Sequence, residues 1–338
     1  MIVKKSISII FIVLFWTISG SALSNKNVSH IGDFKLENGQ KILDCKIAYR
    51  TFGKLNEDSS NVILYPTWFV GTTAHLASVS VPGKIVDSTK YFIVAVAALG
   101  NGESSSPSNS KLQPDKKFPH FNIRDMVHSQ YAMLKKEFGF ENIRAVLGGS
   151  MGGMQAYEWL VRYPDFMDKA LLYVGSPKLT SSDILWFQIQ KNMIKLNPSA
   201  PDSAWAIISA MTQFVARTTE HVSNNVEPEA LEAKGESWRN KKHDNFSLYD
   251  YAAQLDAMAE HDIFKPFNGD KQKTADRIKA DVLQIVSATD VLVNPQPVLD
   301  FLKYFRAETH LLKGNCGHLE PGCQMGKVSM WIQDFLEK

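Results

Sequence analysis

Residues 146–154 read VLGGSMGGM and place Ser150 inside a G-x-S-x-G motif. The apolar run IRAVL leads into the motif, and the helical pattern MQAYEWLVRYP leads out of it and stops at Pro164. A serine on a sharp turn between a strand and a helix needs small neighbours, because larger side chains would collide with both elements. Its hydroxyl then lies beside a helix N-terminus, where free N–H groups favour a developing negative charge. A plain Gly/Ser turn is the alternative, but the flanking strand and helix patterns favour Ser150 as a nucleophile.

The rest of the chain alternates between strand and helix patterns on both sides of this motif. The polar residues 23–32 predict a flexible segment before the first strand. Strand patterns then occupy residues 34–39, 41–53, 62–64, 91–99, 168–174, 281–289 and 308–313. Helix patterns occupy residues 122–138, 297–305 and 324–336. This alternation predicts an α/β fold with a mainly parallel, doubly wound sheet.

A long helical block interrupts the alternation. Residues 178–268 contain no convincing strand pattern, and their helical stretches are separated by a polar segment at 219–246. The block predicts a helical lid inserted into the α/β domain. We therefore divide the chain into a signal peptide (1–22), a first part of the core (23–177), a helical lid (178–270) and a second part of the core (271–338).

The N-terminus has the pattern of a secretory signal. Lys4 and Lys5 precede the short apolar run ISIIFIVLFWTI, and Gly20-Ser21-Ala22 or Ala22-Leu23-Ser24 offers a small-residue cleavage site. An uncleaved membrane anchor is the alternative, because the apolar run is close to the minimum span of roughly 17 residues. The small-residue cluster favours cleavage, so we expect an exported protein, periplasmic or secreted.

Charge and motif content argue against several classes of protein. The chain has 37 Lys and Arg against 35 Asp and Glu, and loss of Lys4 and Lys5 with the signal would leave them equal. This balance predicts no nucleic-acid partner. The sequence has no HExxH, no CxxC pair and neither a P-loop nor a GxGxxG after a strand, so we expect no metal and no cofactor.

Two further positions complete a catalytic pattern. Asp290 directly follows the strand pattern LQIVSAT, and His318 lies in the loop after the last strand. The order Ser150, Asp290, His318 is that of the α/β-hydrolases, in which the histidine takes the serine proton and the carboxylate orients the imidazole. Taken singly, the aspartate could be a turn residue and the histidine a surface residue.

The other histidines offer two rivals for the general base. His128 lies inside a predicted helix, where packing explains it, and His75 follows the third strand and could border the pocket. Neither follows the last strand, as the triad order requires.

The oxyanion site and the acyl pocket can also be assigned. In this fold one N–H comes from the residue after the nucleophile, Met151, and the second from the loop after the third strand, near Trp68. Two aromatic residues of that loop and two of the lid predict a largely apolar pocket beneath the lid: Trp68, Phe69, Trp186 and Phe187. Simple packing is the alternative for Trp68 and Phe69, and both roles can hold together.

The chain has three cysteines. Cys316 and Cys323 bracket a short loop, CGHLEPGC, and an exported protein permits a disulfide between them that would brace His318. Cys45 lies in a strand pattern and is expected to be a buried free thiol.

The stretch LGGSMGGMQAYEWLVRYP closely resembles the nucleophile region of the homoserine O-acetyltransferases. The resemblance continues upstream through GKIVDSTKYFIVAVAALGNGESSSPS and FPHFNIRDMV. It implies an α/β-hydrolase fold, acyl transfer through an acyl-serine, and Ser150, Asp290 and His318 as the triad. It also implies a lid through which members often dimerise, so a homodimer is one expected assembly.

The chain departs from this family at the positions that hold homoserine. The family has an aspartate after the catalytic histidine for the substrate amino group, and this chain has Leu319. The family's lid arginine for the substrate carboxylate corresponds to Lys191. Losing the carboxylate removes a charge-assisted contact worth roughly 1.5–3 kcal/mol.

Three functions fit these observations. The first is an exported serine hydrolase or esterase of small acyl esters, and the second is an acetyl-CoA-dependent homoserine-type O-acetyltransferase. Both form an acyl-Ser150 intermediate and differ in whether water or an alcohol attacks it. The export signal favours the first, because acetyl-CoA is an intracellular metabolite. The third, a non-catalytic binding protein on a hydrolase scaffold, conflicts with the intact triad.

Overall fold

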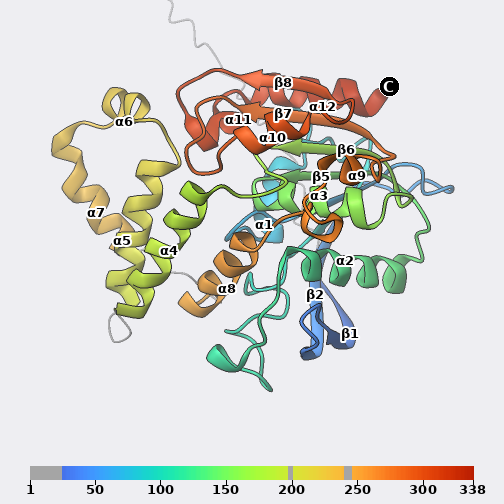
Figure 1. Cartoon of the computed structure of the whole chain (residues 1–338), viewed down its shortest axis with the longest axis horizontal. Coiled ribbons are helices and arrows are strands. Elements are labelled where there is room, and N and C mark those ends of the chain that lie inside the picture. The colour runs from blue at the N-terminus through green and yellow to red at the C-terminus, as the bar shows by residue number, and fades with distance from the viewer. Residues whose placement is uncertain (1–24, 197–200, 240–245) are drawn as a thin grey trace, which may run out of the picture.

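A computed structural model describes residues 25–196, 201–239 and 246–338, and the predicted signal segment lies outside them. The centre is an eight-stranded sheet with strand order β1-β2-β4-β3-β5-β6-β7-β8 (Figure 1). The strands are β1 (Asn27–Lys35), β2 (Lys41–Phe52), β3 (Val62–Pro66), β4 (Phe92–Val96), β5 (Ile143–Gly149), β6 (Met167–Tyr173), β7 (Asp281–Ser287) and β8 (Glu308–Leu312). The β1–β2 and β2–β4 pairs are antiparallel and the other pairs are parallel. The predicted mainly parallel sheet is therefore confirmed.

Helices cover both faces of the sheet and extend beyond one end of it. The α-helices are α1 (Thr73–Val79), α2 (Ile123–Phe138), α3 (Met151–Arg162), α4 (Ser181–Leu196), α5 (Pro201–Val215), α6 (Thr219–Asn225), α7 (Leu231–Arg239), α8 (Leu248–Ala259), α9 (Lys271–Ala275), α10 (Gln296–Phe301), α11 (Glu320–Cys323) and α12 (Met325–Glu337). Short 3-10 segments are η1 (Asp115–Lys117), η2 (Pro228–Ala230), η3 (Lys265–Phe267) and η4 (Gly317–Leu319). None of the helices in the described residues is both long and apolar enough to cross a membrane.

The core divides between the two faces of the sheet because successive strand residues point to opposite sides. Within β4, Val94 and Val96 belong to one apolar cluster, whereas Ile93 and Ala95 belong to the other. The first cluster packs the sheet against α2, α3 and the lid, and the second packs it against α1 and α12. Burial on both faces explains why the parallel strands read as continuous apolar runs.

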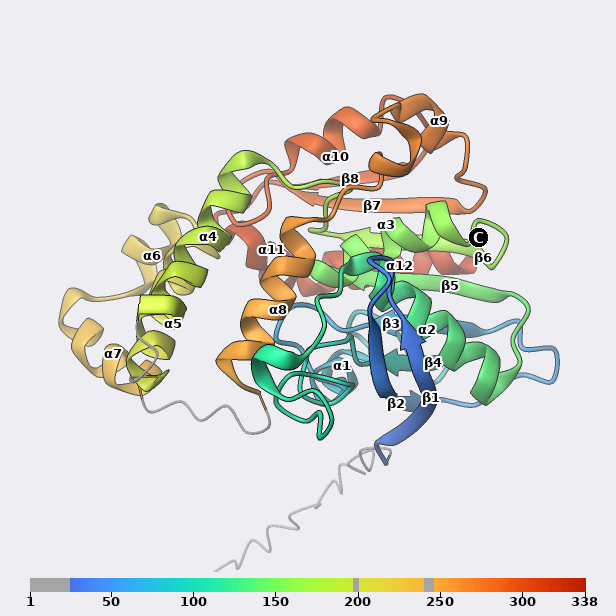
Figure 2. The ribbon, with the colours of Figure 1, turned by 60° about the horizontal axis from the view of Figure 1, so that its bottom comes forward.

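Helices α4 to α7 gather on one side of the sheet, at the left in both views, and α8 lies between them and the sheet (Figures 1 and 2). The predicted helical content of residues 178–268 is thus observed, and the isolated bridge between Lys178 and Asp262 joins the two ends of this block. The polar segment at 219–246 was not expected to be helical, yet it contains α6 and α7. Both helices are short and mostly exposed, so they carry little apolar periodicity. The domain boundaries themselves stay a prediction.

Of two further local predictions, the ends of α2 are confirmed and the flexible segment at 23–32 is wrong in part. Helix α2 has the expected N-cap, since Asn122 and Asp125 form a capping box, and Gly139 ends it in a left-handed conformation. The prediction of a flexible segment at 23–32 is wrong from Asn27 onward, because β1 begins there and pairs with β2. An edge strand with many exposed residues looks polar in sequence, and the register shift around Gly32 hides its alternation.

Candidate active site

The nucleophile turn, residues 148–153, joins β5 to α3. Ser150 is the N-cap of α3 and has φ 53° and ψ −123°, a strained conformation for a residue with a Cβ. Its backbone is held on both sides, because its N–H donates to Tyr173 O at 3.0 Å and its C=O accepts from Met154 N at 3.0 Å. The strained turn therefore places the serine hydroxyl at the end of the sheet, beside the first turn of α3.

Two glycines of this turn are required by close contacts. A Cβ on Gly149 would lie 2.1 Å from the ring of Tyr173, and one on Gly152 would lie 2.8 Å from Pro66 O. At Gly149 the turn packs closely against Tyr173 of β6, and at Gly152 the start of α3 packs closely against the end of β3. The predicted steric reason for small residues here is confirmed at both positions.

His318 lies between Ser150 and Asp290. Its Nε2 is 2.8 Å from Ser150 Oγ, and its Nδ1 is 2.6 Å from Asp290 Oδ2. Asp290 and His318 are 6% and 7% exposed, and Asp290 Oδ1 accepts the N–H groups of Leu292 and Val293 at 2.9 Å each. Both distances fall in the expected range of roughly 2.6–3.2 Å for a nucleophile, its base and the orienting group. The arrangement can pass a proton from the serine to the imidazole while the carboxylate keeps its charge.

The histidine loop, residues 313–324, is held by contacts from several directions. Ser287 Oγ at the end of β7 donates to Gly317 O at 2.7 Å, and buried Glu320 accepts Cys316 N at 2.7 Å. Cys316 and Cys323 form a disulfide, as the sequence predicts, and Cys45 is free and buried. Burial raises the pKa of the Cys45 thiol to about 12, so it is an inert core residue.

The lid also contacts the histidine loop. Thr218 Oγ1, just before α6, donates to Asn315 O at 2.5 Å, and Asn315 Nδ2 donates to Glu220 Oε1 at 3.0 Å. A Cβ on Gly317 would lie 3.0 Å from Arg217 Cα, so the lid backbone packs directly against the residue before His318. The position of His318 therefore depends on contacts from the lid.

The loop after β3 lies against the other side of the nucleophile turn. Thr67 is fully buried; its N–H donates to Val96 O at 3.0 Å and its Oγ1 accepts Ala98 N at 3.0 Å. Trp68 follows it, and its indole stacks on His75 with ring centroids 6.3 Å apart. The backbone N–H of Trp68 donates to no acceptor within the described residues. This N–H and that of Met151 are the two predicted oxyanion donors, and they lie on the two segments that meet at Gly152.

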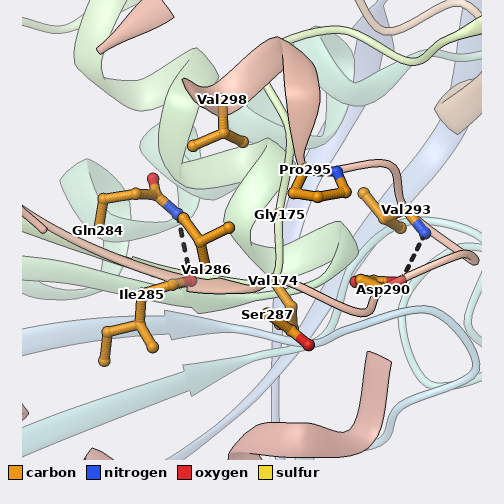
Figure 3. Close-up of a pocket in the computed structure, with 10 residues that line it drawn as sticks. All are labelled: Val174, Gly175, Gln284, Ile285, Val286, Ser287, Asp290, Val293, Pro295 and Val298. Atoms are coloured by element: carbon orange, nitrogen blue, oxygen red, sulfur yellow. Dashed lines mark hydrogen bonds between the residues drawn. The ribbon is translucent and has the colours of Figure 1, made fainter. Parts of the chain in front are cut away.

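A small void lies behind Asp290 (Figure 3). It has a volume of about 10 Å³, room for about one water molecule, and Ser287, Asp290 and Val293 are among its lining residues. Figure 3 shows Asp290 turned toward the N–H of Val293, so the carboxylate is fixed from its own loop.

The family of the chain follows from comparison with known proteins. Residues 82–319 match the family model described as the alpha/beta hydrolase fold, which covers the turn of Ser150, Asp290 and His318. The chain belongs to the α/β-hydrolase family. The predicted fold class is thereby confirmed.

Relatives of this α/β-hydrolase include esterases and acetyltransferases. It is 41% identical over 171 residues to a probable esterase of Corynebacterium glutamicum, covering 50% of this chain and 49% of that protein. It is 37% identical over 192 residues to the ethyl acetate hydrolase of Pseudomonas veronii, covering 56% and 54%. It is 33% identical over 210 residues to the homoserine O-acetyltransferase of Methanohalophilus mahii, covering 56% and 43%. The chain thus spans about half the length of the curated relatives it matches, and the resemblance to homoserine O-acetyltransferases is confirmed.

A solved structure resembles the α/β-hydrolase over nearly its whole length. An acetylester hydrolase of Corynebacterium glutamicum superposes with a TM-score of 0.83 at 26% identity, covering 93% of this chain and 96% of that one. The uncovered 7% of this chain is shorter than the helical block α4–α8, so the similarity extends beyond the sheet.

The predicted pocket residues of this α/β-hydrolase differ in what they contact and in how exposed they are. Phe69 packs on Tyr251 of α8, with ring centroids 4.7 Å apart, and Trp186 of α4 packs on the same apolar cluster. The Trp186 Nε1 is buried without a hydrogen-bond partner in the described residues. Lys191 forms an ion pair with Asp256 of α8, so its ammonium group already has a carboxylate partner within the lid. Leu319, directly after the histidine, is 39% exposed.

The two rival histidines of the α/β-hydrolase are used elsewhere. His75 is exposed on α1 and closes a capping box with Thr72. His128 is half-buried on α2, beside Tyr163, and burial lowers its pKa to about 4. Neither is hydrogen-bonded to Ser150. No cluster of His, Cys, Asp and Glu in the described ranges could hold a metal ion.

Several residues that position the site were missed from the sequence. Ser287 at the end of β7 and Thr218 before α6 hold the histidine loop from outside, and Glu320 holds it from within. Serine, threonine and glutamate are common surface residues, and no spacing marks them as partners of the loop. The roles of Ser287 and Thr218 arise from contacts between distant parts of the chain, which one sequence does not reveal.

Proposed function

We propose that the protein is an acyl-serine enzyme that hydrolyses small acyl esters, with acetyl esters as the substrates to test first. The observation that carries the proposal is the hydrogen-bonded chain from Ser150 Oγ through His318 to buried Asp290. Esterases of acetate-type esters among the relatives and solved structures support the acyl group.

The proposed reaction uses one base twice. Ser150 Oγ bonds to the ester carbonyl carbon while its proton passes to His318 Nε2, and the carbonyl oxygen becomes an oxyanion. The N–H groups of Met151 and Trp68 stabilise that oxyanion. The carbon–alkoxy bond then breaks, and the alcohol leaves with the proton from His318. Water gives a proton to His318 as it attacks the acyl-Ser150, and the acid leaves while Ser150 regains its proton.

The choice of water over homoserine rests on two residues. Leu319 has no charge to pair with an ammonium group, and Lys191 is held by Asp256. We propose that Phe69 and Trp186 supply apolar walls of the acyl pocket instead. A homoserine-type O-acetyltransferase is the second candidate, because such enzymes are among the relatives.

The experiment compares both reactions in one preparation. The protein is assayed with short p-nitrophenyl esters, and separately with acetyl-CoA and homoserine. We expect burst kinetics with the esters, loss of nearly all activity in Ser150→Ala, and little homoserine-dependent release of CoA. Ser129→Ala is the matched control, because Ser129 is a buried serine of α2 that donates to Met126 O. Efficient acetylation of homoserine, at roughly 10⁴ M⁻¹s⁻¹ or more in kcat/KM, would replace this proposal with the second candidate.

A single substitution sharpens the choice of acceptor. Leu319→Asp places a carboxylate directly after His318, and we expect homoserine-dependent release of CoA to rise at least roughly tenfold, as a charge-assisted contact predicts. Leu299→Asp is the matched control, because Leu299 on α10 is 37% exposed against 39% for Leu319. An equal response of the two variants would show that Leu319 does not govern the acceptor.

Export and assembly complete the proposal. We propose that residues 1–22 direct export, and the Cys316–Cys323 disulfide suits an oxidising compartment. N-terminal sequencing of exported protein tests cleavage. We also propose a homodimer through the lid, since Leu185 of α4 and Phe214 of α5 are 57% and 59% exposed. Light scattering on wild type and Phe214→Glu tests the dimer, and a monomeric wild type would refute it.

A further inference from the structure

A series of buried polar side chains, joined by hydrogen bonds, runs through the core next to the nucleophile turn. It consists of Gln155 and Trp159 on α3 and Gln130 on α2, all 0% exposed. Trp159 Nε1 donates to Gln130 Oε1 at 3.0 Å, and Gln130 Nε2 donates to Gln155 Oε1 at 2.6 Å. Gln155 Nε2 then donates to Thr67 O at 3.0 Å and to Met151 O at 3.1 Å. This series of hydrogen bonds thus ends on the two segments that carry the proposed oxyanion donors.

The direction of these hydrogen bonds is fixed from both ends. The indole N–H of Trp159 can only donate, so Gln130 must present its oxygen there and its amino group to Gln155. The two carbonyls, of Thr67 and Met151, can only accept, so Gln155 must present its amino group to them. Both ends demand the same orientation of the two amides.

The contact with Thr67 O has a consequence for the next residue. The peptide unit from Thr67 C=O to Trp68 N–H is planar and trans, so its C=O and N–H point in opposite directions. A donor that fixes Thr67 O therefore fixes the direction of the Trp68 N–H. The peptide that carries the Met151 N–H is fixed in the same way, by Met154 N donating to Ser150 O.

The two proposed donors thus differ in what aims them. A backbone bond of α3 aims the N–H of Met151, whereas a side chain aims the N–H of Trp68. We infer that Gln155 is a positioning residue, which aims the Trp68 N–H at the oxyanion by holding Thr67 O, with Gln130 and Trp159 holding Gln155. The inference rests on the proposed function, since it assigns how one of the proposed oxyanion donors is held.

The test needs a readout that a merely structural glutamine would not move. An alkyl fluorophosphonate supplies one: Ser150 Oγ bonds to phosphorus, fluoride leaves, the serine proton passes to His318, and the phosphoryl oxygen occupies the oxyanion site. The second-order rate constant of labelling, measured by intact mass, reports that site without requiring the natural substrate. The dissociation constant of p-nitrophenyl acetate, taken from the dependence of the burst rate on its concentration, reports binding of the ground state. Thermal unfolding reports stability.

The decisive variant is Gln155→Met, which keeps the length of the side chain and removes the donor. We expect its labelling rate and its kcat to fall about 10–100-fold, because loss of an oxyanion donor costs roughly 10²–10³ and a misaimed one costs less. The dissociation constant of p-nitrophenyl acetate should change less than about threefold. Gln130→Met should have a smaller effect in the same direction, because Gln155 keeps both carbonyl contacts.

Gln284→Met is the matched control. Gln284 is 1% exposed and its amide contacts Tyr157 Oη and Ile285 O, away from the loop after β3. We expect this variant to lower the unfolding temperature as Gln155→Met does while its labelling rate stays within about threefold of wild type. Should Gln155→Met fail to fold, Gln155→Glu replaces it, since a buried neutral carboxyl keeps one donor for the two carbonyls and should give an intermediate rate.

The outcomes separate the two claims. If wild type is labelled at Ser150 and Gln155→Met or Gln155→Glu is labelled at the same rate, the glutamine only packs and the inference is wrong. If wild type is not labelled, or Ser150→Ala is labelled equally fast, the proposed function itself fails and the inference falls with it.

Discussion

The nucleophile turn and the histidine loop meet at one hydrogen bond, yet they are built in opposite ways. In the turn, the strained backbone of Ser150 and the contacts of Gly149 and Gly152 fix the geometry. In the histidine loop, side chains such as Ser287 and Thr218, brought from β7 and the lid, hold the backbone around His318. The first region is fixed by its backbone conformation and by close packing of its glycines, and the second by side-chain hydrogen bonds and a disulfide.

The difference indicates how each region should respond to substitution. A change inside the nucleophile turn meets backbone or a fully packed ring and has no room to relax. A change in the histidine loop removes one of several supports and leaves the others in place. We therefore expect all-or-none effects in the turn and graded effects in the loop.

The largest expected effect comes from Gly149→Ala. Its Cβ would lie 2.1 Å from the Tyr173 ring, so the turn or the ring must move, which costs about 3 kcal/mol of unfolding free energy. Thermal or urea unfolding measures the loss, and ester hydrolysis should fall with it. Gly326→Ala is the matched control, because a Cβ there meets nothing within 4 Å. If both variants unfold like wild type, the turn is not fixed by this contact.

The next largest effect should come from removing the disulfide with Cys316→Ser and Cys323→Ser together. The bridge closes a short loop and contributes about 2–3 kcal/mol by chain entropy. Because His318 lies between the two cysteines, kcat for ester hydrolysis should fall about tenfold while KM changes little. Cys45→Ala is the control, since it removes a buried thiol outside the site. Unchanged kcat in the double variant would show that the remaining contacts suffice.

The smallest expected effect is a loss of stability at low pH that comes from His261, which lies outside both regions. Burial lowers the pKa of His261 to about 4, and its Nε2 donates to Ser176 O where the lid joins the core. The unfolded chain binds this proton near pH 6.5, so stability is present above that pH and falls toward pH 4. Between pH 7 and pH 5 the loss should be about 2 kcal/mol. Urea unfolding measures it.

His261→Gln is the comparison variant for this pH effect, because a glutamine can donate to Ser176 O without titrating. The negative charge of Asp262 opposes the shift and is present in both proteins. Subtracting the two pH profiles should isolate the histidine. Parallel profiles would mean that His261 keeps its ordinary pKa.

What the sequence predicts depends on whether a feature is encoded by neighbouring residues or by contacts between distant ones. The capping box of Asn122, the stop at Gly139 and the nucleophile turn are encoded locally, and the structure has all three. Asp290 and His318 were found because their chain order and strand-end positions restrict the choice. Gln155 lies in the quoted motif region, but nothing in its neighbours marks the contact with Thr67, which is 88 residues away in sequence.

The expectations that failed have a common cause. Residues 27–32 look flexible because an edge strand exposes polar side chains, and α6 and α7 look like a polar loop because little of them is buried. Apolar periodicity reports burial, so elements at the edge of the sheet or on the outside of the lid give a weak signal. Tertiary contacts decide the structure at these positions.

The central claim is that Ser150 carries the acyl group, and the most direct test is to observe it there. Purified protein is mixed with p-nitrophenyl acetate, quenched in acid during the burst, digested and analysed by mass spectrometry. We expect one acetyl group on the peptide containing Ser150, formed at the rate of the burst and absent from Ser150→Ala. An active enzyme whose acetyl group appears on another residue, or that shows no adduct and keeps its activity in Ser150→Ala, would contradict the account.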